Sequence, residues 1–196
     1  QVWSWDITKL RTPVLFVYLF LYVILDIFSR YVVGWMIAEH ATAQLAKRLI
    51  SETITREQVD RDGLTLHADR GSQMIAQPVV SLCAKLGIAR SYNRPHVSND
   101  NPFSESQFGT AKQHPSFPRR FGGIVDALTW GREFFPWYNQ EHHHSGLAYL
   151  TPATVHHGLV NAVLEQRARA LQSLLGRAAL RHAALVLGLR PALRRG

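Results

Sequence analysis

The sequence predicts a mixed α/β fold, in which helices pack on the faces of a β-sheet. Two β-rich segments, 16–28 and 31–38, are joined through Ser29-Arg30, as in an antiparallel hairpin. Later segments with helical spacing of apolar residues alternate with short strands. The order of three strands, a helix, a strand, a helix and a strand favours a mixed sheet covered by helices.

The composition indicates a folded domain. The chain has 196 residues, of which 46% are hydrophobic and 18% charged, so it can bury a core. Cys83 is the single cysteine, which excludes an internal disulfide framework and a cysteine-rich zinc site. We expect Cys83 to be a buried core residue in a reducing compartment.

The first predicted strand covers residues 2–8. Alternation along it places Trp3 and Trp5 on one face and Ser4 and Asp6 on the other.

The apolar run over 14–25 raises the question of a membrane span. It has twelve residues, whereas a spanning helix needs roughly twenty. Its Val, Tyr, Phe and Ile content favours a buried strand. The chain begins at Gln1 without a basic and apolar leader, so we expect no signal peptide and interpret the sequence as part of a longer protein.

The remaining elements follow from caps and breakers. Helices are predicted over 43–56 with Thr42 as N-cap, over 78–86 ending at Gly87, from the Asn101-Pro102 cap to about His114, and over 124–141. Short strands are predicted over 64–68 and 88–92, and a loop over 93–101. Trp130, Phe134, Phe135 and Trp137 fall in the last helix and are interpreted as packing residues.

Most of the net charge of +8 comes from the last part of the chain. Residues 161–196 hold seven arginines against Glu165 alone, whereas residues 1–160 are nearly neutral. We therefore divide the chain into a core, 1–160, and an Ala/Leu/Arg-rich basic tail, 161–196, with helical spacing of its leucines and alanines. A solvated helix is the simpler interpretation of the tail; a DNA-clamping or dimerising arm is the alternative.

Three acidic residues occupy positions that suggest a shared site. Asp6 lies within a strand, Asp69 at the end of a strand, and Glu105 in the first turn of a helix. A carboxylate in an apolar strand is costly to bury unless it meets a cation. Three carboxylates brought together would form a site for Mg²⁺. Such a site could catalyse in-line displacement at a phosphodiester.

The helix of Glu105 adds a basic residue. Phe108, Gly109 and Lys112 follow Glu105 by three, four and seven residues and are predicted to share its face. Lys112 is then suited to hold a DNA phosphate, and Gly109 would allow a backbone to approach closely.

Several short segments together form a family pattern. They are Trp5-Asp6-Ile7-Thr8, Leu25-Asp26-Ile27-Phe28-Ser29-Arg30, His67-Ala68-Asp69-Arg70-Gly71-Ser72-Gln73, the run from Ser98 to Phe108, Tyr138-Asn139, His143-His144-Ser145-Gly146-Leu147 and Leu150-Thr151-Pro152-Ala153. With them, residues 2–158 resemble the catalytic core of insertion-sequence transposases related to retroviral integrases. Thirty-five residues separate Asp69 from Glu105, the spacing typical of that family's last two acids.

The resemblance implies a ribonuclease-H-like fold and an enzyme that cleaves DNA and transfers strands with Mg²⁺, for which Mn²⁺ can substitute. It makes Asp6, Asp69 and Glu105 the catalytic metal ligands and Lys112 a contact to the element end. The implied partners are element-end and target DNA and further copies of the chain, in the bacterial cytoplasm at the nucleoid. The helix-turn-helix region usual in the family is not among these residues, so a separate helix-turn-helix subunit is expected. The basic tail does not match the family's usual ending.

Two other functions remain open at this point. One is a non-catalytic transposase remnant that binds DNA or other subunits through its tail. The other is a ribonuclease-H-like nuclease that stops at hydrolysis. They differ from a transposase in whether the three acids are needed and in whether joined DNA products form.

Other polar residues have simpler interpretations. We expect Asp26 to have a local structural role through Ser29 and Arg30. Residues 142–144 are three histidines that would point to different faces of a helix, so a structural or DNA-proximal role is favoured over zinc. His67 lies two residues before Asp69 and either tunes the metal site or packs beside it.

Overall fold

The computed structural model describes residues 1–59, 63–93 and 101–186, without the side chains of 177 and 179–186. The chain divides into two compact units, residues 1–156 and 157–196. Whether the predicted core and tail are independent domains stays a prediction. In the described part of the chain, no helix is long and apolar enough to cross a membrane.

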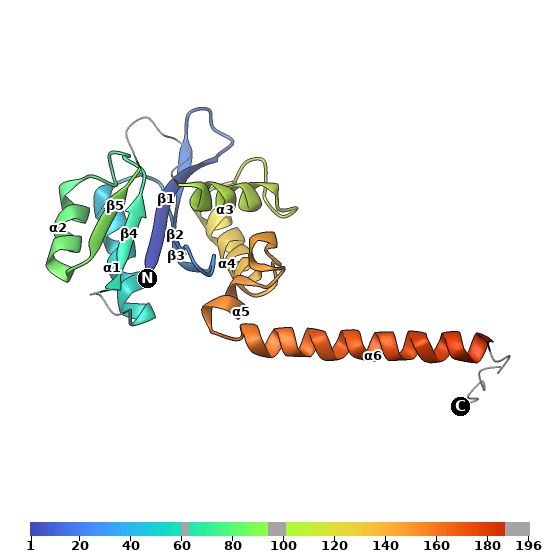
Figure 1. Cartoon of the computed structure of the whole chain (residues 1–196). Coiled ribbons are helices and arrows are strands. Elements are labelled where there is room, and N and C mark those ends of the chain that lie inside the picture. The colour runs from blue at the N-terminus through green and yellow to red at the C-terminus, as the bar shows by residue number, and fades with distance from the viewer. Residues whose placement is uncertain (60–62, 94–100, 187–196) are drawn as a thin grey trace. The chain divides into compact units, whose positions relative to one another are not determined.

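The first unit is built on a twisted sheet with the strand order β3-β2-β1-β4-β5 (Figure 1). The strands are β1 (Val2–Arg11), β2 (Tyr18–Asp26), β3 (Val32–Ala38), β4 (Thr65–Ala68) and β5 (Ala89–Tyr92). β1, β2 and β3 pair antiparallel, whereas β4 pairs parallel to both β1 and β5. The mixed sheet predicted from the sequence is confirmed.

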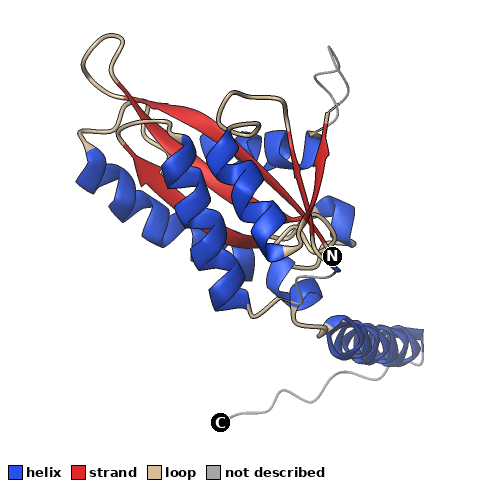
Figure 2. Ribbon diagram, turned by 90° about the vertical axis from the view of Figure 1, so that its left-hand side faces the viewer, coloured by secondary structure: helices blue, strands red, loops and turns tan. Residues whose placement is uncertain are grey.

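Helices cover both faces of this sheet (Figures 1 and 2). They are α1 (Ala43–Glu57), α2 (Gln77–Leu86), α3 (Pro102–Gln113) and α4 (Ile124–Gln140). Trp3 and Trp5 are buried in the core beneath α1 and α2. Leu21 and Val23 of β2 are buried with α3 and α4 on the other face. Polar Ser4 and Asp6 therefore face α3, as the alternation predicted.

The predicted caps are confirmed. The Thr42 side chain accepts a hydrogen bond from the backbone N–H of Leu45 at 3.3 Å, and α2 ends at Gly87 with φ of 70°. Asn101 precedes α3. Most of the loop predicted over 93–101 lies outside the described residues. The sequence did not predict the short helices η3 (Ser145–Leu147) and α5 (Pro152–His156).

The strand predicted over 16–28 is shorter than expected. The segment Val14–Val17 is an exposed turn, and the strand begins at Tyr18 and ends at Asp26. Phe28 in the next turn is also exposed. Val14–Val17 and Phe28 lie beyond the ends of the strand and are exposed. Their apolar composition therefore led to a prediction of a strand that is too long.

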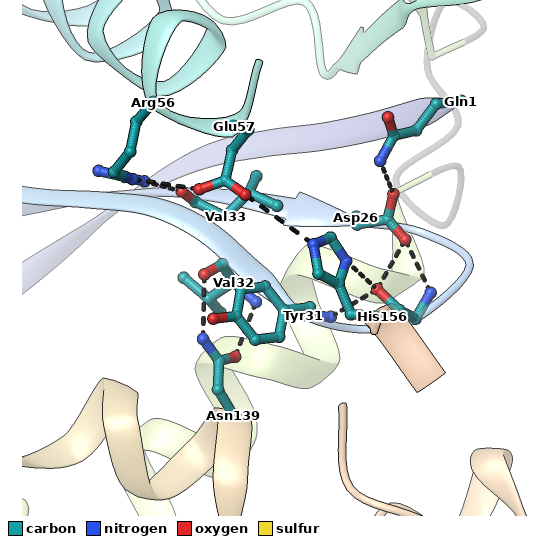
Figure 3. Close-up of polar contacts among 10 residues, drawn as sticks. Gln1, Asp26, Tyr31, Val32, Val33, Arg56, Glu57, Asn139 and His156 are labelled. Carbon is teal, nitrogen blue, oxygen red and sulfur yellow. Dashed lines mark hydrogen bonds and ion pairs between the residues drawn. The ribbon is translucent and has the colours of Figure 1, made fainter. Parts of the chain in front are cut away.

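Asp26 organises the turn between β2 and β3 (Figure 3). Its Oδ1 accepts hydrogen bonds from the backbone N–H and the hydroxyl of Ser29, at 2.8 and 2.7 Å. Its carbonyl accepts from the N–H of Arg30, and its Oδ2 from the Gln1 side chain. The predicted structural role of Asp26 is confirmed.

The same end of the sheet fastens α4 and α5. The Asn139 side chain of α4 accepts from the N–H of Val32 and donates to its carbonyl, at 2.9 and 3.1 Å. The His156 ring of α5 stacks on Tyr31 at 4.3 Å between centroids, and its Nδ1 lies 3.1 Å from the Ser29 hydroxyl (Figure 3). These contacts hold helices from late in the sequence against an early hairpin.

The second unit contains α6 (Val160–Val186). Arg169 pairs with Glu165 one turn earlier, at 3.5 Å. Among the described side chains of α6, the exposed leucines are Leu164, Leu171, Leu174 and Leu175. Both interpretations of the tail, a solvated helix and an arm that contacts DNA or another copy, stay predictions.

We expect Asp26→Ala to lower the free energy of unfolding by about 2 to 4 kcal/mol, measured by urea denaturation. The carboxylate is 3% exposed and accepts several hydrogen bonds, whose donors would lose their partner. Glu52→Ala on α1 is the control, because Glu52 forms an exposed pair with Arg48 and should contribute less than about 1 kcal/mol. Equal losses in the two variants would contradict the structural role.

Candidate functional site

The register between β1 and β4 brings two of the predicted acids side by side. Ser4 is the partner of His67 in this parallel pair. β4 ends at Ala68, so Asp69 directly follows the paired strand. The same offset, continued by two residues, would place Asp69 opposite Asp6 on the face of Ser4, because side chains two residues apart in a strand share a face.

The third acid comes from α3, whose start is fixed on the same face of β1. The hydroxyl of Ser4 donates to Asn101 Oδ1 at 2.5 Å and lies 2.7 Å from the hydroxyl of Ser104. These three side chains are buried. Ser104 immediately precedes Glu105, so this buried contact fixes the position of Glu105 in the first turn of α3 relative to β1.

The electrostatics show that the predicted site residues share one environment. The pKa of Asp6 is raised from 3.8 to about 6; burial is the largest cause of the rise, and the negative charges of Asp69 and Glu105 also contribute to it. The N–H of Ile7, 2.7 Å from Asp6 Oδ1, and the Lys112 ammonium lower the pKa of Asp6. Asp6 is therefore within electrostatic range of all three other predicted residues.

The donor set suits a hard divalent cation. It consists of carboxylate oxygens, which are the ligands that such cations prefer. Among the described side chains, no three His, Cys, Asp or Glu residues lie close enough together to hold a metal ion. Asp69 Oδ1 instead accepts from the Gly71 N–H at 2.8 Å.

Lys112 lies on the exposed side of α3. Its ammonium donates to the Thr8 hydroxyl at 2.8 Å, two residues beyond Asp6 on β1. A methyl group placed on Gly109 would meet no described atom within 4 Å, so this part of α3 is open as predicted. The Phe108 ring is buried in the core, and the Lys112 ammonium lies 5.8 Å from its centroid, so these two residues lie side by side on α3 as predicted.

A basic groove of about 1030 Å³ begins beside Lys112. Its other lining residues are Ile7, Thr8, Lys9, Arg11, Tyr18, Phe117, Arg119 and Arg120, and none of the described lining residues is acidic. The sequence analysis found Lys112 alone. The adjacent arginines 119–120 and the alternating cations 9 and 11 were the signals that could have revealed the rest.

The histidines have local partners. His67 Nδ1 lies 3.1 Å from the Ser91 hydroxyl of β5. The His144 ring accepts from the Gly146 N–H and caps η3, while His142 stacks on Tyr138. Burial, with neighbouring positive charges, lowers the pKa of both His142 and His144.

Comparison with known proteins identifies the family. Residues 1–98 match a family model described as an integrase core domain, and residues 86–152 match a second with the same description. The chain belongs to the integrase core domain family. Its curated relatives include insertion-sequence proteins. An uncharacterised 31 kDa protein of insertion element IS600 from Shigella sonnei is 30% identical over 154 residues. The transposase of IS904 from Lactococcus lactis is 30% identical over 156 residues.

This integrase core covers only part of those relatives. Each alignment spans 78% of the chain, but 56% of the IS600 protein and 59% of the IS904 transposase.

Solved structures share the fold. The HTLV-2 integrase catalytic core domain in complex with magnesium has a TM-score of 0.59 at 16% identity, over 80% of this chain and 95% of that one. A simian T-cell lymphotropic virus intasome chain has a TM-score of 0.61 at 17% identity, over 80% and 54%. The ribonuclease-H-like fold class is confirmed.

Asp6→Asn should stabilise the metal-free protein at neutral pH. The unfolded chain loses the Asp6 proton near pH 3.8 and the folded protein near pH 6, so wild-type stability falls as pH rises through that window. Asn carries no such proton. In EDTA at pH 7.5 we expect the variant to be more stable by up to about 3 kcal/mol, and at pH 4 by little. Urea denaturation at both pH values measures this.

Glu133→Gln is the matched control, because Glu133 is an exposed acid on α4. It should leave the pH dependence of unfolding unchanged. A variant at position 6 that is no more stable than wild type at pH 7.5 would show that the Asp6 carboxylate is not destabilised by its surroundings.

Proposed function

We propose that this chain is the catalytic core of an insertion-sequence transposase. Such an enzyme cleaves DNA and joins the 3′-hydroxyl of one strand to a phosphate of another strand. One observation carries the proposal: Asp6 interacts electrostatically with Asp69, Glu105 and Lys112, and Lys112 also lines a basic groove. Membership of the integrase core family and the resemblance to two transposase-related relatives support it.

Each acid has a distinct support in the fold. Asp6 and Asp69 come from neighbouring parallel strands, and Glu105 from a helix start tied to Ser4. We propose that these three carboxylates bind Mg²⁺, or Mn²⁺ in its place. A bound divalent cation would activate the attacking oxygen and stabilise the leaving oxygen at phosphorus.

The basic groove would position the DNA. Lys112 is the cation nearest the acids, because it alone among the described cations affects the pKa of Asp6. It would hold the phosphate next to the reacting one, and Arg119 and Arg120 would hold phosphates further along the groove. Attack by a terminal 3′-hydroxyl then forms one P–O bond and breaks another, releasing a new 3′-hydroxyl.

Further subunits complete the proposal. The chain spans somewhat more than half of its curated relatives, so recognition of element ends is assigned to a helix-turn-helix region outside this sequence. A homo-oligomer on DNA is also proposed. The HTLV-2 integrase core was described in trimeric and dimeric forms.

A branched DNA that mimics the joined product tests the chemistry without requiring a known target. The 3′-hydroxyl at the branch can attack the junction and resolve the branch, which reverses joining. With Mg²⁺ or Mn²⁺ the wild-type chain should release the resolved strand, and Asp69→Asn should lower the rate at least 100-fold. Denaturing gel electrophoresis of the labelled strand measures the product.

The controls separate the open alternatives. Glu133→Gln should retain the rate, and EDTA should abolish it. Nicked strands without resolved or joined products would favour a nuclease that stops at hydrolysis. An Asp69→Asn rate equal to that of wild type would contradict the metal assignment. DNA binding that is indifferent to all three acids, without any product, would favour a non-catalytic remnant.

Lys112→Ala should weaken DNA binding and reduce its dependence on salt. Removing one phosphate contact should lower the slope of log affinity against log salt by roughly one. Fluorescence anisotropy with a labelled duplex at several salt concentrations measures this. Lys47→Ala, which removes an exposed lysine of α1, should leave the slope unchanged. Equal slopes for wild type and Lys112→Ala would remove Lys112 from the DNA contact.

A further inference from the structure

The turn between β1 and β2 displays an unusual amount of apolar surface. Val14, Leu15, Phe16 and Val17 are consecutive, and their exposed fractions are 62%, 74%, 87% and 49%. Exposed turns normally use Gly, Asn, Asp or Ser. Four neighbouring apolar side chains in water are a typical sign of a binding surface.

The turn is held in a defined shape. The N–H of Val17 donates to the carbonyl of Val14 at 3.2 Å. The Thr12 hydroxyl donates to the carbonyls of Val14 and Val17, at 3.2 and 2.8 Å. Phe16 has φ of 62°, a left-handed conformation that is unfavourable for a side chain of this size. The backbone thus presents the Phe16 ring to solvent at a conformational cost, which suggests a functional reason for it.

Positive charges flank the turn. The segment after α3 is bound to the base of the hairpin, because Arg120 donates to the carbonyl of Pro13 and the N–H of Phe121 donates to that of Arg11. Arg11 and Arg120 line a small hollow together with the apolar turn, and they also line the basic groove. The described part of the hollow has no acidic lining residue.

The groove therefore follows β1 from Ile7, next to Asp6, to Arg11, next to the apolar turn. At one end lies Lys112, beside Asp6; at the other lie Arg11 and Arg120, beside the turn. Figure 1 shows this turn at the end of the sheet opposite the N-terminus, the end toward which β1 runs past Asp6. From Asp6 to Pro13 is seven residues of extended chain, about 23 Å. That length corresponds to about seven nucleotides of a B-form strand.

We propose that Val14–Val17 form an apolar wedge that stacks against DNA bases, five to eight nucleotides from the reacting phosphodiester. Arg11 and Arg120 bind the phosphates that flank the unstacked bases. Apolar side chains rimmed by arginine are suited to open a base step, because the ring replaces base stacking while the guanidinium groups neutralise the backbone. The charge of the groove favours DNA over a second copy of this nearly neutral core. The inference rests on the proposed function for the position of the reacting phosphate.

Fluorescence of 2-aminopurine tests the wedge independently of catalysis. We use a duplex with a recessed 3′ end that carries 2-aminopurine at the sixth position from that end, in EDTA, and a second duplex with the probe at the sixteenth position. Binding of the wild-type chain should raise the fluorescence of the first duplex and leave the second unchanged. Phe16→Ser should abolish the rise and weaken binding roughly 5- to 150-fold, the loss of one stacked base. Phe16→Trp should restore both.

Phe28→Ser is the matched control, because Phe28 is 80% exposed in the turn at the other end of β2. It should retain the fluorescence rise. Circular dichroism should show that each variant is folded, since neither ring is in the core. A rise that persists in Phe16→Ser, or that is lost equally in Phe28→Ser, would overturn the wedge.

Two further outcomes separate the wedge from the proposed function. Resolution of branched DNA without any fluorescence rise would overturn the wedge and leave the proposed function intact. A rise that depends on Phe16, together with no branch resolution by the wild-type chain, would support the wedge and contradict the proposed chemistry. A Phe16→Ser variant with altered sedimentation but an unchanged rise would overturn the wedge in favour of a contact between copies.

Discussion

The parallel pairing of β1 with β4 is the constraint on which the candidate site depends. It pairs Ser4 with His67, two residues before Asp6 and Asp69, and a shift of one residue in this pairing would change the position of Asp69 relative to Asp6. The tryptophans on β1 prevent such a shift, because Trp3 and Trp5 are fully enclosed beneath α1 and α2. Packing on one face of the strand thus determines the position of charge on the other.

This arrangement stores unfavourable electrostatic energy in the fold. Burial and two neighbouring carboxylates raise the pKa of Asp6, and one lysine offsets only part of that effect. Stability must come from elsewhere, and the far end of the sheet provides it. There Asp26, Asn139 and His156 bind the hairpin, α4 and α5 together through buried or half-buried hydrogen bonds (Figure 3). At one end of the sheet the polar side chains are hydrogen-bonded to one another, whereas at the other end the three acids are not fully buried.

The two aspartates of the first hairpin illustrate this division. Asp6 and Asp26 lie on paired strands, yet Asp26 accepts hydrogen bonds from a serine, an N-terminal glutamine side chain and the backbone. Asp6 accepts one from the adjacent N–H, and the charges that act on it are the negative ones of Asp69 and Glu105 and the positive one of Lys112. Residue type does not distinguish these aspartates; their partners do. The unbalanced one is the natural place for a cation.

The sequence by itself determined the elements and the acids. Alternation along β1, the Thr42 and Asn101 caps, and the spacing of Asp69 and Glu105 are local or pairwise patterns, which need no knowledge of packing. Only the tertiary structure decided which apolar residues are buried. Val14–Val17 and Leu19–Val23 are both runs of aliphatic and aromatic residues, but only the second packs under helices, and α3 and α4 come from much later in the chain. The groove was decided in the same way, because residues 119–120 reach residue 11 only when the segment after α3 binds the first hairpin.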